Sequence, residues 1–128
     1  MLQLKEHNKI EGSLTIMNET QKSLILEAAT TVVESAKTLQ NGADIGIDAM
    51  KNFSRFSASK HSFEVYLLMD ASFAAIPEIE KFQSAIFDFE GHYVKLRNLI
   101  DEKMDSKAAK PSFEVLENSF ESLKKYLA

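Results

Sequence analysis

The chain contains no cysteine among its 128 residues. Without thiols it cannot form a disulfide scaffold, a cysteine-ligated zinc site or an iron–sulfur cluster, and it has no cysteine nucleophile. Turn-forming residues are also scarce, with two prolines and four glycines. A sandwich or barrel with many short strands needs more of them, so this scarcity favours helices.

Clustered positive charge is absent as well. The longest run of lysine or arginine is the pair Lys124 and Lys125, and the formal net charge is -4. Because DNA binding through a basic face needs clustered cations, we expect no DNA partner. The longest apolar run, Val65 to Ile76, is too short to span a bilayer, and the polar N-terminus lacks the apolar stretch of a signal peptide. We therefore expect a cytoplasmic protein that does not enter membranes.

The overall composition is that of a globular protein, with 45% hydrophobic and 27% charged residues. Its length suits one domain, so we expect residues 1–128 to form a single helical bundle. Residues 1–12 show no helical period. We expect them to form a loosely ordered N-terminal arm.

Apolar residues recur at intervals of three and four along most of the chain, which is typical of amphipathic helices. The pattern predicts a long helix over residues 14–40 and a short one over 45–57. The small polar residues from Ser57 to Ser62 predict a hinge. A third helix, apolar nearly all round, is expected over about 60–76.

The most regular pattern begins at Pro77, which suits the first turn of a helix. The inward positions that follow are Ile79, Phe82, Ile86, Phe89, Tyr93, Leu96 and Ile100. The sequence Lys110-Pro111-Ser112 predicts the start of a last helix. Together these patterns predict an all-α fold, an antiparallel bundle of four long helices plus one short helix.

Arg55 is followed six positions later by His61. This spacing resembles the Arg-x4-6-His motif of the HEPN ribonucleases, which are small all-helical toxins. The resemblance implies that these two residues, contributed by two subunits, would act on an RNA phosphate, with the histidine as acid-base catalyst and the arginine as a fixed cation. RNA is a partner only under this hypothesis. The alternative is an exposed histidine near a helix start and an arginine near a helix end.

His92 and Lys95 form a His-x-x-Lys sequence. It resembles the core motif of histidine-phosphotransfer domains, which are four-helix bundles of this size. The resemblance implies that His92 would accept a phosphoryl group from a response regulator. The alternative is a histidine at the boundary of the core on a long helix.

Metal and cofactor chemistry have little support in the sequence. No histidine stands at ligand spacing from the carboxylates of Asp101 and Asp105, and His61 and Glu64 are a lone pair. The scattered glycines do not form a phosphate-binding loop. We expect no metal and no cofactor. Asp70, within the predicted third helix, is expected to form a salt bridge or to lie on an exposed edge.

Phe87, Gly91 and Val94 form a second stripe on the helix that begins at Pro77, opposite its inward face. A glycine inside an exposed helix costs about 1 kcal/mol relative to alanine, so Gly91 needs a reason. The stripe either packs inside the bundle or is a docking surface for another chain. Between the two we favour packing inside, because Leu26, Thr30 and Val33 form a stripe on the first helix that could meet it.

No catalytic constellation emerges from the chain as a whole. The function we expect is therefore non-catalytic contact with another protein or with a second copy of the chain. Such a regulatory protein could be an inhibitor, an adaptor, a chaperone or an immunity-type protein, and Phe87, Gly91 and Val94 are its candidate partner-binding residues.

Overall fold

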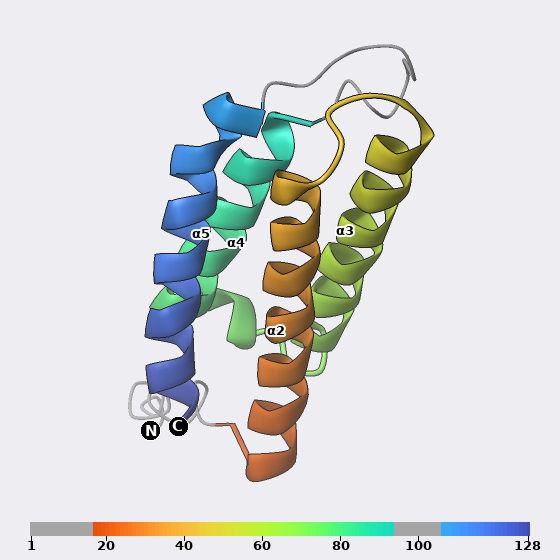
Figure 1. Cartoon of the computed structure of the whole chain (residues 1–128). Helices are drawn as coiled ribbons and strands as arrows, with labels where there is room; N and C mark the ends of the chain where they lie inside the picture. Colours follow the sequence, from red (N-terminus) through yellow and green to blue (C-terminus); the bar gives the residue numbers. More distant parts are fainter. Residues whose placement is uncertain (1–16, 94–105) are drawn as a thin grey trace, which may run out of the picture.

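The computed structural model describes residues 17–93 and 106–128, and these parts of the chain form helices without strands (Figure 1). The elements are α2 (Glu19–Asn41), α3 (Gly46–Leu67), the short 3-10 helix η1 (Phe73–Ala75), α4 (Pro77–Gly91) and α5 (Ser106–Leu127). Successive long helices run in opposite directions, as Figure 1 shows. The predicted all-α antiparallel bundle is confirmed. The predicted arm over residues 1–12 lies outside the described residues.

The helices are packed more closely on three sides of the bundle than on the fourth. The backbones come close between α2 and α3, between α2 and α5, and between α4 and α5. On the fourth side, α3 and α4 meet mainly through aromatic rings. The ring centroids of Phe56 and Phe89 are 5.4 Å apart and those of Phe63 and Phe82 are 5.2 Å apart, both edge to face. These large side chains keep the two backbones apart.

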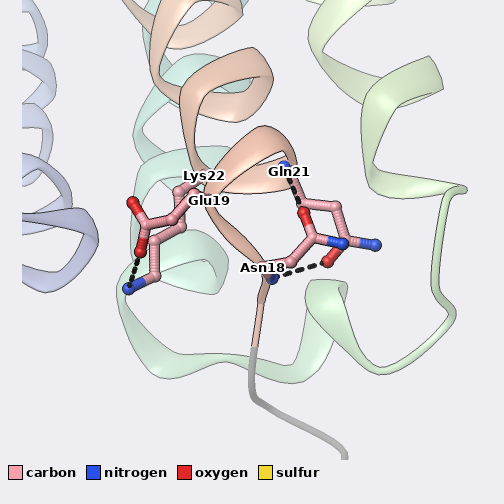
Figure 2. A network of polar contacts seen from close by, with 4 residues as sticks. All are labelled: Asn18, Glu19, Gln21 and Lys22. Carbon is pink, nitrogen blue, oxygen red and sulfur yellow. Dashed lines mark hydrogen bonds and ion pairs between the residues drawn. The ribbon is translucent and has the colours of Figure 1, made fainter.

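The start of α2 is fixed by a capping box (Figure 2). The backbone N–H of Gln21 donates to Asn18 Oδ1 at 2.8 Å, and the backbone N–H of Asn18 donates to Gln21 Oε1 at 2.9 Å. This exchange satisfies two backbone donors that a helix start otherwise leaves without partners. The helix therefore begins at Glu19, whereas the sequence pattern placed its start near residue 14.

The core-facing pattern predicted for the helix from Pro77 is confirmed as far as Tyr93. Its members Ile79, Phe82, Ile86, Phe89 and Tyr93 are all buried. The Tyr93 hydroxyl donates to Gln40 Oε1 on α2 at 3.1 Å, so the polar end of this ring has a partner. Leu96 and Ile100 lie outside the described residues.

The predicted hinge at Ser57 to Ser62 is wrong, because α3 runs without a break from Gly46 to Leu67. The polar residues there do not interrupt the helix: Ser59 Oγ donates to the carbonyl oxygen of Arg55 at 2.9 Å, within the helix itself. Phe56 and Phe63, two helical turns apart, are both fully buried and hold the two halves on one core face. The expected short helix and the first part of the expected third helix are thus a single helix that ends at Leu67, and the rest of the range predicted for the third helix forms a turn and η1.

The chain turns after α3, at Leu68 to Ser72, so Asp70 lies in a turn and not in a helix. Asp70 Oδ1 accepts hydrogen bonds from the backbone N–H of Ser72 at 2.9 Å and from its hydroxyl at 2.8 Å. The backbone bond, and then the hydroxyl bond, hold the pKa of the Asp70 carboxyl below its ordinary value. Asp70 therefore shapes the turn into η1, a role that the sequence pattern did not predict.

The predicted start of the last helix at Lys110 is also wrong. α5 begins at Ser106 and contains Pro111 within it. Proline removes a backbone donor from a helix, but this helix buries a regular apolar stripe that offsets the loss. The stripe consists of Ala109, Phe113, Leu116, Phe120, Leu123 and Leu127. None of the helices described is long and apolar enough to cross a membrane.

Candidate partner-binding face

The side on which α3 and α4 stand apart contains an open groove. Its larger part is a cavity of about 500 Å³ lined by Met50, Phe53, Ser54, Ser57, Lys60, His61, Glu64 and Glu90. A smaller hollow of about 40 Å³ is lined by Lys60, Phe63, Glu64, Gln83, Ile86 and Phe87. The two hollows share Lys60 and Glu64, and together we call them the α3–α4 groove.

A partly buried ion pair lines the groove. Lys60 Nζ of α3 is 2.9 Å from Glu90 Oε1 of α4, and the Glu90 side chain is only 6% exposed. A carboxylate removed from water to this extent needs a partner, and the ammonium of Lys60 supplies one. The pair therefore joins α3 to α4, two neighbouring helices whose backbones do not pack closely.

Glu90 was missed by the sequence analysis, although the sequence holds a signal for it. It follows Ile86 by four residues and Ile79 by eleven, which places it on the inward face of α4. Both isoleucines and Glu90 are buried. A charged residue at an inward position predicts a buried partner, and the partner is Lys60.

Arg55 and His61 are not brought together within the chain. On one continuous helix a separation of six residues is a rotation of about 240°. His61 consequently lines the α3–α4 groove, where its Nδ1 lies 3.6 Å from Glu64 Oε1. Arg55 lines a different cavity, together with Thr31 and Glu34 of α2. Within one chain the two residues therefore line separate cavities.

His92 lies directly after α4 and is half-buried. Its Nε2 is 3.1 Å from Ser112 Oγ of α5, so the ring is held against the neighbouring helix. Lys95, the second residue of the motif, lies outside the described residues. Of this motif the structure describes His92 alone, whose contact with Ser112 joins the end of α4 to α5.

Phe87 and Gly91 face solvent, so the expectation that their stripe packs inside the bundle is wrong for these two residues. Phe87 is 74% exposed. A Cβ atom at Gly91 would meet no atom within 4 Å. Leu26 and Val33, the expected counterpart on α2, are partly buried against the core. Val94 lies outside the described residues.

The two edges of the groove are formed by residues at intervals of four, three and four. On α3 the edge consists of Ser57, His61, Glu64 and Leu68, the last being the residue directly after the helix. On α4 we define the edge as the outward stripe that contains Phe87, which lines the groove, and that helical spacing extends to Glu80, Ser84 and Gly91. We call these eight residues together with the groove the α3–α4 face. Leu68 is 80% exposed, so each edge carries one large apolar side chain in water.

The face offers little for metal chemistry. Among the residues that the structure describes, no three histidine, aspartate or glutamate side chains are grouped so that they could hold a metal ion. Tyr126, whose pKa is raised by burial and by the charge of Glu78, lies near the end of α5 and not in the groove. No protein-family profile, curated protein or solved structure matches this chain.

Proposed function

We propose that this chain acts by binding another protein through the α3–α4 face and performs no catalysis of its own. The observation that supports the proposal is the exposure of Phe87 beside the open position of Gly91. Removing a phenylalanine side chain from water is worth about 1.5–3 kcal/mol, and aromatic residues are enriched at interfaces. Gly91 leaves room for a partner's backbone to approach next to that ring.

The proposal covers a regulatory role such as that of an inhibitor, an adaptor, a chaperone or an immunity-type protein. It places the protein in the cytoplasm, a location with which the absence of cysteine agrees. A second copy of the chain is the alternative partner, in which case the protein is an oligomer.

Photocrosslinking tests the proposal directly. The photoreactive analogue p-benzoylphenylalanine is placed at position 87 of the full chain in its source cells, and in a second variant at position 115. Val115 is the control because it is 53% exposed on α5 and lies outside the α3–α4 face. We expect a covalent adduct with another polypeptide from position 87 and none from position 115, both detected by mass spectrometry.

Two results would contradict this proposal. One is the absence of any adduct from position 87, and the other is the same set of adducts from both positions. An adduct between two copies of the chain identifies the partner as a second copy.

A further inference from the structure

The edges of the α3–α4 face carry two exposed carboxylates and no lysine or arginine, and the imidazole of His61 lies 3.6 Å from one of the carboxylates. Glu64 lies on the α3 edge and Glu80 on the α4 edge, and both are exposed. Lys60, which lines the groove, is paired with Glu90. Lys81 and Asp88 lie further round α4, on its side away from α3. The edges that a partner would touch are therefore acidic.

The positions of these acids follow from the antiparallel register of α3 and α4. Phe63 is level with Phe82 and Phe56 is level with Phe89, as their ring contacts show. By this register Glu64 and Glu80 lie at nearly the same height on opposite edges of the groove.

The two exposed apolar side chains lie on either side of this acidic level. In this register Phe87 of α4 lies opposite residue 58 of α3. Leu68 is about ten residues further along α3 than that position. At 1.5 Å per residue the separation along the groove is about 15 Å, close to three turns of a helix. The face thus presents an apolar side chain, a pair of acids and a second apolar side chain in that order.

We propose that the α3–α4 face binds an amphipathic helix of another protein that carries lysine or arginine between its apolar residues. This inference rests on the proposed function and specifies the chemistry of the partner. A groove between two helices receives a third helix through apolar residues about one turn apart. Lysine or arginine near the middle of that helix reaches both Glu64 and Glu80. A second copy fits less well, because two chains of net charge -4 would bring like charges together.

Three synthetic peptides serve as probes, each a labelled amphipathic helix of about 18 residues with the same leucine stripe. They differ only in the residues flanking the stripe, which are lysine, glutamine or glutamate. Fluorescence anisotropy gives their affinities for the full chain at low and at high salt. We expect the lysine peptide to bind at least about tenfold more tightly than the glutamate peptide, with the difference shrinking in high salt.

Variants locate the binding on the face. Phe87→Ser weakens binding of the lysine peptide by about tenfold or more, whereas the control Val115→Ser leaves it unchanged. The double variant Glu64→Lys, Glu80→Lys loses the preference for lysine over glutamate. Leu68→Ser provides a second apolar test at the other end of the groove. The altered side chains are exposed, so circular dichroism and urea midpoints are expected to stay at wild-type values.

Any one of three peptide results overturns the inference: no binding of the lysine peptide, equal binding of the lysine and glutamate peptides, or equal losses in Phe87→Ser and Val115→Ser. Concentration-dependent dimerisation in light scattering that Phe87→Ser abolishes also overturns it, in favour of a second copy. The crosslinking experiment at position 87 is independent of the peptides. An adduct there without peptide binding rejects the basic helix and leaves the proposed function standing.

Discussion

α4 has two neighbours that it meets in different ways. Toward α5 its backbone comes close, and Phe82 and Phe89 contact Phe120 and Phe113 with ring centroids 6.0 and 5.7 Å apart. Toward α3 the backbones stay apart and the gap contains aromatic rings, the Lys60–Glu90 ion pair and an open groove. Close apolar packing supplies stability, whereas a wider and partly polar junction leaves surface that another molecule can occupy.

The largest expected effect is a difference in stability between substitutions on the inner and on the outer face of α4. Phe82 is fully buried between Phe63 and Phe120, so Phe82→Ala removes core contacts and is expected to cost about 3–5 kcal/mol in the free energy of unfolding. Phe87→Ala on the exposed face should change it by less than about 0.5 kcal/mol. Urea unfolding of both variants measures the difference. Similar losses in the two variants would contradict the assignment of inner and outer faces.

The ion pair allows a test of the α3–α4 junction itself. Lys60→Met leaves the buried Glu90 carboxylate without its ammonium partner, and we expect a loss of about 2–3 kcal/mol in the free energy of unfolding. The double variant Lys60→Met, Glu90→Leu removes both charges and should recover to within about 1 kcal/mol of the wild type. Urea unfolding of the wild type, the single variant and the double variant measures this. A double variant less stable than Lys60→Met would show that Glu90 is held chiefly by its other contacts.

Alanine substitutions at two glycines compare a crowded position with an open one. A Cβ atom at Gly42 would lie 2.6 Å from Asn52 Nδ2 and 2.9 Å from the carbonyl oxygen of Thr38, whereas at Gly91 it would meet nothing within 4 Å. Gly42→Ala is therefore expected to cost about 1–2 kcal/mol. Gly91→Ala should leave stability unchanged or raise it by up to about 0.5 kcal/mol through helix propensity. Thermal midpoints of the two variants check this, and a destabilised Gly91→Ala would mean that the position is packed.

Comparing the predicted helices with the observed ones shows which features hydrophobic periodicity can predict. The inward face of α4 from Ile79 to Tyr93 could be predicted because apolar residues at intervals of three and four all lie on one side of a helix. The continuity of α3 through Ser57 to Ser62 could not, since small polar residues suit both a turn and a solvated helix face, and only the burial of Phe56 and Phe63 on the same core decides between them.

The candidate site was predictable only in part, for a related reason. Phe87 and Gly91 were identified from their spacing, but a second stripe on a helix has the same sequence pattern whether a neighbouring helix or solvent covers it. Glu90 and Lys60 lie thirty residues apart in the sequence, and their pairing depends on the register of two helices. Such a register is a tertiary property that no local pattern contains.

The smallest expected effect is a change in the pH dependence of stability, and it concerns Asp70 in the turn between α3 and η1. Hydrogen bonds from Ser72 favour the ionised form of Asp70, so its pKa in the folded protein is below the ordinary value of 3.8 that it has in the unfolded chain. The folded state then binds fewer protons than the unfolded state in this range. Its stabilisation by Asp70 is complete above the unfolded value and is lost as the pH falls through the folded pKa.

Asp70→Asn keeps an oxygen that can accept from Ser72 but removes the charge. We expect this variant to lose part of the acid-induced fall in thermal midpoint that the wild type shows below about pH 4. Ser72→Ala is the matched control, because it removes the hydroxyl bond and keeps the backbone bond, and its pH dependence should fall between those of the other two proteins. Thermal midpoints of wild type and Asp70→Asn that remain parallel from neutral pH into acid would show that the turn stabilises the charged carboxyl no more than the unfolded chain does.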